Sequence, residues 1–354
     1  MMKPAAAALL SLGRGQAPEH IFSWDELVPL AERHQVAPLL YWNASESESV
    51  RRALEGAPAG VQARLRIAWL HHTLRNEHLA ANLVELDRAL EAQGVTGIVL
   101  KGPWLAYAAY PHPGTRTIDD IDLCIREQDY VRARKAIESL GYAAAEELPS
   151  SMQGAMDRAQ LRGQLRFAAR GRRQLELHFR MVNVGIPGRD EGWLWERTRS
   201  LPLPGGSIRV PGPEAMLLHL ALHANQHGFA ALRLFYDLRF FLDREGGTLD
   251  RDVFLGLVRS HRCGASVYHA LSLARELAAA PVDEDLLESL RPSRLRRRIF
   301  SVLWDLRSVR SLERPLRSPR VEAPRLYLLE MDGPLARTRY LVALARGSGT
   351  SRRR

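Results

Sequence analysis

Two aspartates on one expected strand are the residues of this chain best suited to chemistry. Residues 118–126 alternate as a β-strand does, so Asp120 and Asp122 project side by side while Asp119 points away. Two carboxylates so close together repel each other unless a cation neutralises them. An acidic strand end in solvent is the simpler interpretation, but aspartate is disfavoured in strands and apolar residues surround this pair. A metal site is therefore expected, and Mg²⁺ suits ligands that are all oxygen.

Apolar runs and helical spacing around this pair predict mixed α/β structure in the middle of the chain. A run between Gly94 and Gly102 indicates a buried strand, and glycine again ends a helical pattern at Gly141. Two later extended runs joined by residues 170–173 predict a hairpin. The expected strands are residues 95–100, 118–126, 164–169 and 174–181, and the expected helices are 104–110 and 128–140.

Helical patterns dominate on both sides of this region. We expect one helix over residues 22–40, where Ser23 and Glu26 have the spacing of a capping box. A long helix follows over residues 61–92, and its apolar residues do not share one stripe, which predicts burial on more than one side. Later helices are expected at residues 214–227, 232–242, 252–260, 265–278 and 286–306.

These patterns predict an α+β fold in three regions. A core with a small mixed β-sheet, residues 94–210, follows an N-terminal helical region, residues 1–93. A C-terminal helical region with a basic tail completes the chain over residues 211–354. The first 12 residues weakly imitate a signal peptide, but their apolar part is short and we expect a frayed helix.

Composition narrows the class of protein. Apolar residues make up 46% and charged residues 25% of the 354, which is typical of a globular chain of about two domains. No uncharged apolar stretch of about 18 residues is present, so no membrane partner is expected. The two cysteines, Cys124 and Cys263, are too few for a disulfide scaffold or a Cys-rich zinc module. We expect a cytoplasmic protein.

The basic residues are almost all arginines, and the formal net charge is +10. Because arginine suits phosphate, a polyanionic partner is one interpretation. A GC-rich genome that favours arginine codons is the simpler one. The basic runs at residues 294–298 and 352–354 lack the interleaved aromatics of a single-strand binding groove, so we expect a solvated face and a loose tail.

The motifs around the aspartate pair resemble those of the polymerase-β-like nucleotidyltransferase superfamily. The resemblance is closest to an uncharacterised bacterial nucleotidyltransferase family with a Leu-Lys-Gly motif, here residues 100–102. Pro-Gly-Thr-Arg at residues 113–116 and the pair Asp120 and Asp122 follow it. Residues 175–178 (Leu-Glu-Leu-His) are similar to the strand that bears the superfamily's third carboxylate, and the resemblance covers about residues 22 to 245.

The resemblance implies transfer of a nucleoside monophosphate, AMP from ATP, to an acceptor hydroxyl. Asp120, Asp122 and Glu176 would be the catalytic residues and would hold one or two Mg²⁺ ions. Glu176 would complete the second metal site or help to deprotonate the acceptor. Because residues 174–181 alternate, Glu176 shares the open face of the aspartates if their strands are neighbours. A solvent-facing Glu176 paired with an arginine is the alternative.

Lys101, Gly102 and Arg116 are the residues expected to bind the nucleotide. Pro103 removes one backbone N–H from the glycine turn, so we expect Lys101 to compensate as a point charge on the triphosphate. Arg116 is expected to bind phosphate through two parallel hydrogen bonds. The alternatives are a structural Lys–Asp pair for Lys101 and a surface-loop position for Arg116.

Four histidines lie in the motifs. His178 is expected either to support the metal ligands or to be a core residue that is hydrogen-bonded to backbone. His219, His223 and His227 share one helical face. Their spacing is possible for metal ligands, but no glutamate follows the first as in H-E-x-x-H. We expect them to line the groove between the helical region and the core, where they meet substrate or base.

Two other functions stay open. The chain is either catalytic or a non-catalytic relative that binds nucleotide or protein, and its complete set of three carboxylates argues against the latter. An RNA-directed nucleotidyltransferase is the other alternative, and steep salt dependence of RNA binding would support it. No motif specifies the acceptor, which is a small molecule, a peptide, a protein or an RNA.

Overall fold

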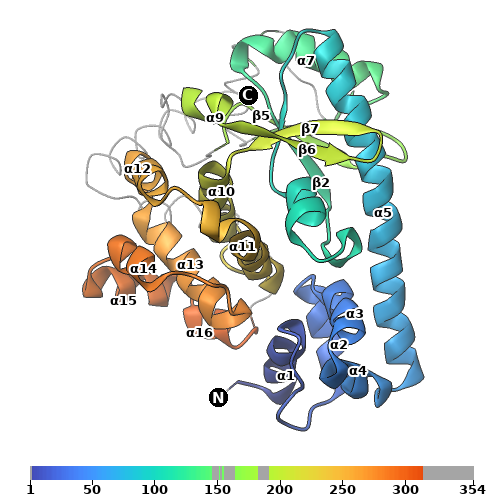
Figure 1. Ribbon diagram of the computed structural model, residues 1–354, viewed down its shortest axis with the longest axis vertical. Helices are drawn as coiled ribbons and strands as arrows, with labels where there is room; N and C mark the ends of the chain where they lie inside the picture. The colour runs from blue at the N-terminus through green and yellow to red at the C-terminus, as the bar shows by residue number, and fades with distance from the viewer. Residues whose placement is uncertain (1, 146–150, 152–153, 155–163, 182–190, 314–354) are drawn as a thin grey trace, which may run out of the picture.

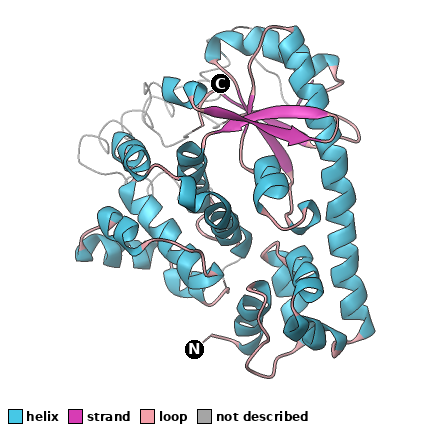
Figure 2. Cartoon of the chain, in the orientation of Figure 1, coloured by secondary structure: helices cyan, strands magenta, loops and turns pink. Residues whose placement is uncertain are grey.

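A small mixed sheet lies among helices in the computed structural model, which describes residues 2–145, 151, 154, 164–181 and 191–313 (Figure 2). The strand order is β1-β2-β5-β4-β3. β2 runs parallel to β5, and the other neighbours are antiparallel. The strands of this sheet are β1 (Ile98–Val99), β2 (Asp120–Cys124), β3 (Ala143–Ala144), β4 (Leu165–Ala168) and β5 (Gln174–His178). The expected α+β class and the expected hairpin, which is β4 and β5, are confirmed.

Helices flank the sheet on both sides of the molecule. In Figure 1, α5 runs along one side from α1–α4 to α7, and α10–α16 occupy the other side. The first helices are α1 (Pro4–Gly13), α2 (Trp24–Arg33), α3 (Ala37–Glu46), α4 (Glu48–Glu55), α5 (Ala59–Ala92), α6 (Gly102–Trp104), α7 (Tyr130–Ser139) and α9 (Gly192–Glu196). The later ones are α10 (Pro213–Gln226), α11 (Leu232–Glu245), α12 (Arg251–His261), α13 (Gly264–Ala278), α14 (Glu284–Leu290), α15 (Arg294–Leu303) and α16 (Leu306–Arg310).

One hairpin was not anticipated from the sequence. β6 (Thr198–Leu203) and β7 (Gly206–Pro211) pair antiparallel and pack against β1 and α5. Gly205, at φ +87°, lies in the turn between them. The signal in the sequence was the Gly-Gly pair between two alternating runs, which favours a tight turn.

Two helices expected to be continuous are broken. The helix over residues 22–40 stops at Arg33, and Gln35 has a φ of +59° before α3 begins. The Gln35 side chain donates to Asp119 and accepts from Arg233, so tertiary contacts hold this break. The helix over residues 286–306 is also interrupted, because Pro292 separates α14 from α15.

The first and last helices of the N-terminal region, α1 and α5, also differ from expectation. α1 is not frayed, because most of its alanines and leucines are buried. α5 is not buried on several sides along its whole length, since Ile67 and Leu74 on its first half are 64% and 66% exposed.

No helix in the described part of the chain is long and apolar enough to cross a bilayer. The C-terminal tail lies outside the described residues.

Candidate active site

The pairing of β2 with β5 brings the three expected carboxylates together. The register places Asp122 opposite Glu176, and Asp120 lies two residues before Asp122 on the same face of β2. The intervening apolar residues of both strands are buried on the other face of the sheet. The expectation that the two strands are neighbours, with all three carboxylates on one face, is therefore confirmed.

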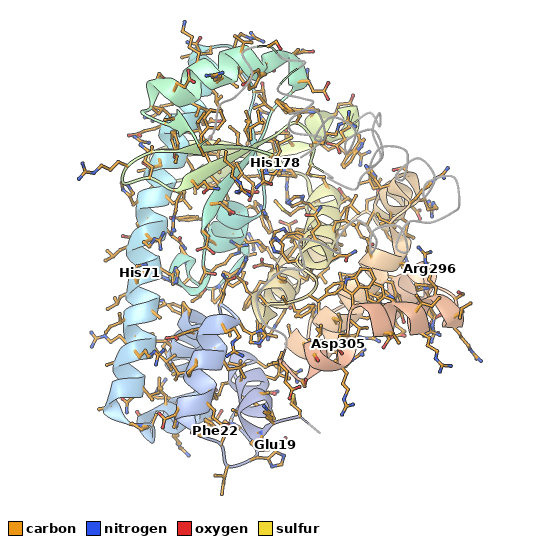
Figure 3. All side chains as sticks on the ribbon, turned by 180° about the vertical axis from the view of Figure 1, so that it is seen from behind. Glu19, Phe22, His71, His178, Arg296 and Asp305 are labelled. Atoms are coloured by element: carbon orange, nitrogen blue, oxygen red, sulfur yellow. The ribbon has the colours of Figure 1, made fainter. Side chains whose placement is uncertain are left out.

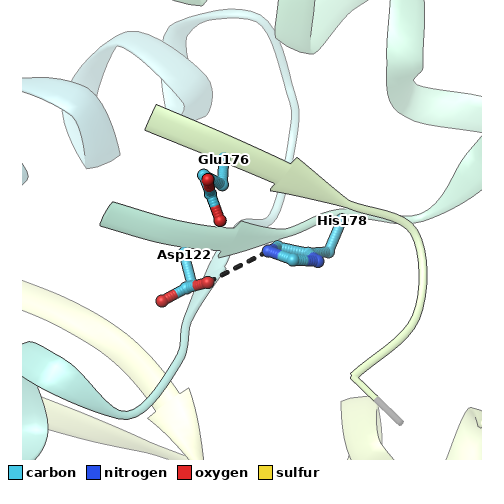
Figure 4. Close-up of side chains that lie close together, drawn as sticks. All are labelled: Asp122, Glu176 and His178. Carbon is cyan, nitrogen blue, oxygen red and sulfur yellow. Dashed lines mark hydrogen bonds and ion pairs between the residues drawn. The ribbon is translucent and has the colours of Figure 1, made fainter. Parts of the chain in front are cut away.

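His178 joins this cluster. Asp122, Glu176 and His178 each offer one ligand atom, and these atoms lie within 4.8 Å of one another (Figure 4). The His178 imidazole donates from Nε2 to Oδ1 of Asp122 at 3.1 Å. Figure 3 shows His178 near the middle of the molecule rather than at its edge. Glu176 is only 9% exposed and so does not face solvent, but its Oε1 lies 3.5 Å from Nε of Arg166, so the arginine pair of the alternative is present.

The cluster opens into a cleft of about 440 Å³ between the sheet and the helices α10 and α11. The three carboxylates and the Lys101–Gly102 turn form one wall. His219, His223 and His227 line the opposite side, as expected from their shared helical face. Asp119, which was expected to point away, lies at the rim and accepts a hydrogen bond from Gln35.

Lys101 makes two contacts inside the cleft. Its Nζ lies 3.1 Å from Oδ2 of Asp122 and 3.3 Å from Nδ1 of His223. Its backbone has a φ of +36°, which is a strained conformation for a residue with a Cβ and costs of the order of 1–3 kcal/mol. The structure thus contains the Lys–Asp pair considered above, and a phosphate contact by Lys101 stays a prediction.

The carboxylates have unequal electrostatic environments. Burial would raise the pKa of Asp122, but the Lys101 charge and the His178 hydrogen bond outweigh it and hold this pKa well below its usual range. Burial, together with the neighbouring Asp122, raises the pKa of Asp120. Burial and both aspartates raise the pKa of Glu176. Further positive charge in the cleft would relieve this repulsion.

The donor set fits a divalent cation. Asp122 and Glu176 of the close cluster supply carboxylate oxygens of the type that Mg²⁺ prefers, and Asp120, on the same face of β2 but outside that cluster, would add a third. The Nε2 of His178 would ligate a metal only after giving up the proton that it donates to Asp122, and an imidazole ligand suits Mn²⁺ or Zn²⁺ better than Mg²⁺. His178 was not anticipated as a ligand, although its place two residues after Glu176 on one strand was the available signal.

Arg116 has a different environment from the surface loop considered above. It is 2% exposed and donates from Nε and Nη2 to the two carboxylate oxygens of Asp237, at 2.8 and 2.9 Å. Tyr110 and Arg233 also donate to Asp237. A Cβ on Gly102 would lie 3.1 Å from the Arg116 guanidinium, so only glycine fits this close approach easily. Phosphate contacts by Arg116 and Gly102 stay predictions, and for Arg116 they require loss of its Asp237 pair.

The histidines on α10 are held by specific hydrogen bonds. His219 donates from Nδ1 to the backbone oxygen of Met181 at 2.9 Å, because that carbonyl only accepts. Burial lowers the pKa of His219 to about 4 and that of His223 further below its usual range. Both rings are therefore neutral at pH 7. His227, at the end of the helix, is exposed at the rim.

Comparisons with known proteins identify the family of this chain. No curated protein matches the chain. The solution structure of the antibiotic-resistance factor ANT(2'')-Ia is 16% identical with a TM-score of 0.35, over 55% of this chain and 95% of that one. The crystal structure of ANT(2'')-Ia with adenylyl-2''-tobramycin is 15% identical with a TM-score of 0.35, over 52% and 96%. Residues 20–279 match a family described as uncharacterised nucleotidyltransferase, and the chain belongs to that family.

Proposed function

We propose that this protein is a Mg²⁺-dependent enzyme that transfers AMP from ATP to an acceptor hydroxyl. The observation that carries the proposal is the convergence of Asp120, Asp122 and Glu176 on one face of β2 and β5, at the floor of a cleft. Burial, and then repulsion among the carboxylates, raises the pKa of Asp120 and of Glu176, which supports a site that binds a cation. Perturbed pKa values of this kind are typical of a functional site.

Each cleft residue then has a chemical task. Asp120, Asp122 and Glu176 would hold one or two Mg²⁺ ions, which stabilise negative charge on the α-phosphate and on the departing pyrophosphate. The acceptor oxygen forms a bond to the α-phosphorus while the bond to the pyrophosphate oxygen breaks. Glu176, whose pKa is raised, is proposed either to complete the second metal site or, where it holds no metal, to take the acceptor's proton. Lys101 is placed to meet the phosphate chain beside Asp122.

A non-catalytic role receives less support from the site. The carboxylates are buried together, with a lysine in a strained backbone conformation between them and α10. A protein that only docked to another protein would have no need of that arrangement. No described residue selects one class of acceptor. The test therefore includes several classes.

Label position provides the test. The purified protein is incubated with Mg²⁺ and ATP labelled at the α- or the γ-phosphate, together with separate small-molecule, peptide, protein and RNA fractions. If AMP is transferred, the acceptor becomes labelled only when ATP carries the label on its α-phosphate. The pyrophosphate released from that α-labelled ATP is then unlabelled. Asp122→Asn is the matched negative control. Labelling from the γ-position, or equal labelling by Asp122→Asn, would contradict the proposal.

A further inference from the structure

The ring of His223 is fixed in one tautomer by its neighbour. The Lys101 ammonium carries only donors, so Nδ1 of His223, 3.3 Å away, must accept. The proton of the neutral ring is then on Nε2. Burial and the Lys101 charge both lower the pKa of His223, which keeps the ring neutral. His223 thus offers the cleft a hydrogen-bond donor without a charge.

Lys101 itself has little freedom to release this ring. Its Nζ lies 3.1 Å from Oδ2 of Asp122, and its side chain is only 12% exposed. The φ of +36° at Lys101 shows that the surrounding structure imposes this position on the backbone. Asp122, Lys101 and His223 therefore form one connected row from the floor of the cleft to α10.

The next histidine on the same helix has the opposite tautomer. His219 uses its Nδ1 proton on the backbone oxygen of Met181, so its Nε2 is a bare acceptor. That Nε2 is buried and has no hydrogen-bond partner among the described residues. The two rings are nearly parallel, with centroids 6.2 Å apart. The donor of His223 therefore has, one turn before it on α10, a histidine whose buried Nε2 can only accept.

A phosphate oxygen should bind His223 in preference to His219. It accepts hydrogen bonds and cannot donate when ionised, so it is attracted to Nε2–H of His223 and repelled by the lone pair of His219. A phosphate chain that reaches Asp122 through a metal also passes Lys101, and His223 is the next residue of the row. His223 lines the cleft, and no hydrogen-bond partner for its Nε2 is present among the described residues.

We propose that His223 binds a non-bridging phosphate oxygen of the nucleotide through Nε2–H, and that Lys101 is the positioning residue that fixes this tautomer. The inference rests on the proposed function, because it assumes that the nucleotide occupies this cleft. It assigns to α10 a direct part in phosphate recognition.

Binding measurements separate the phosphate contact from a contact to the base. Calorimetry with Mg-ATP, Mg-tripolyphosphate and adenosine is carried out on the full chain and its variants. His223→Asn, which is too short to reach with a donor at the Nε2 position, should weaken ATP and tripolyphosphate by about tenfold alike. His223→Gln, whose amide NH₂ replaces the donor, should recover most of that loss. His219→Gln, the matched control, should leave tripolyphosphate affinity within about twofold of the unchanged chain.

The tautomer of His223 can be measured directly by NMR spectroscopy. In ¹⁵N-histidine spectra, His223 should show a protonated Nε2 and an unprotonated Nδ1, and Lys101→Met should convert it to a mixture. Addition of Mg-tripolyphosphate should shift the Nε2 resonance of His223 and change that of His219 less. A protonated Nδ1 on His223, or equal tripolyphosphate affinity of His223→Asn and the unchanged chain, would overturn the inference.

The two proposals fail in different ways. If the unchanged chain binds Mg-ATP and Asp122→Asn does not, while His223→Asn binds normally, only the role of His223 is wrong. If the unchanged chain binds neither Mg-ATP nor Mg-tripolyphosphate, the nucleotide site and the role of His223 both fall.

Discussion

Asp120 and Asp122 lie two residues apart on β2, yet their surroundings push their pKa values in opposite directions. Lys101 and His178 both contact Asp122, which stays ionised in a buried position. Asp120 has no such contact among the described residues, and the Asp122 charge raises its pKa on top of the effect of burial. Asp122 is thus stabilised by partners in the protein, while Asp120 has no oppositely charged group in contact with it among the described residues.

Replacing Asp120 by asparagine should therefore stabilise the metal-free protein. A carboxyl whose pKa is raised by folding destabilises the native state once the pH is high enough to ionise it. Asp120→Asn should raise the free energy of unfolding by of the order of 1 kcal/mol at pH 7, and the gain should vanish near pH 4. Urea unfolding in EDTA measures it. The same variant should lose AMP transfer. An Asp120→Asn protein less stable than the parent at pH 7 would refute this view of the pair.

The Arg116–Asp237 pair has the opposite character, because both partners are buried and mutually satisfied. Burial would raise the pKa of Asp237, but Arg116 and Arg233 outweigh it and lower this pKa. Asp237→Asn leaves the Arg116 charge without its carboxylate and should destabilise the fold by about 3–5 kcal/mol. The double variant Arg116→Met with Asp237→Leu should recover much of this loss.

Thermal or urea unfolding of the two variants tests whether Arg116 is structural. If Arg116 binds phosphate instead, Arg116→Met should lower ATP affinity while the free energy of unfolding stays near that of the parent. That result would restore the phosphate role expected from the sequence.

At the scale of elements, local pattern predicted many of the strands and helices but missed the β6–β7 hairpin and two helix breaks, and contacts between residues distant in sequence form the site. The alternation of residues 118–126 placed Asp120 and Asp122 correctly on one face. Nothing local pairs β2 with β5, whose residues Asp122 and His178 are 56 apart in the chain. Arg116 and Asp237 are 121 apart, so no spacing rule connects them. The break at Gln35 likewise depends on contacts with Asp119 and Arg233.

Helix capping provides a matched test of local pattern against structure. Ser23 has the capping-box spacing, yet its side chain makes no cap hydrogen bond at the start of α2. Asp250 caps α12, because its Oδ1 accepts from the Val253 N–H at 3.0 Å. Asp250→Ala should therefore lower the free energy of unfolding by about 1 kcal/mol, whereas Ser23→Ala should change it by a few tenths at most. Equal losses for the two variants, measured by urea unfolding, would show that Ser23 does cap α2.

At the scale of the whole molecule, the buried apolar residues form one continuous cluster from α1 to α16. His34 connects distant parts of it. Its Nδ1 accepts from the Leu232 N–H at 3.1 Å, and its Nε2 then donates to the Leu312 oxygen at 3.1 Å. The turn after α2, the start of α11 and the end of α16 are thereby held by one neutral ring. Protonation would remove the acceptor that Leu232 needs, so the link exists only while His34 is neutral.

Several neutral histidines of this kind should make the whole fold sensitive to mild acid. Burial lowers the pKa of His34 and His219 to about 4, that of His269 to about 3, and that of His223 well below its usual range. In the unfolded chain these rings titrate near 6.5, so between that pH and about 4 the unfolded state binds more protons than the native state. Stability therefore falls as the pH falls, by up to about 1.4 kcal/mol per pH unit for each ring.

The acidic groups of the cleft act in the other direction. Folding raises the pKa of Asp120 and Glu176, so the native state binds more protons than the unfolded state over their titration range and gains stability as the pH falls. Four histidines outweigh two carboxyls, and we expect the free energy of unfolding to drop by at least about 4 kcal/mol from pH 7 to pH 5. Urea unfolding in EDTA at pH 7, 6 and 5 measures the slope. His269→Gln should make this dependence of the unfolding free energy on pH less steep, by the equivalent of about one proton, because one titrating ring is removed. A free energy of unfolding that is unchanged over this range would show that these rings are protonated to the same extent in the native and unfolded states.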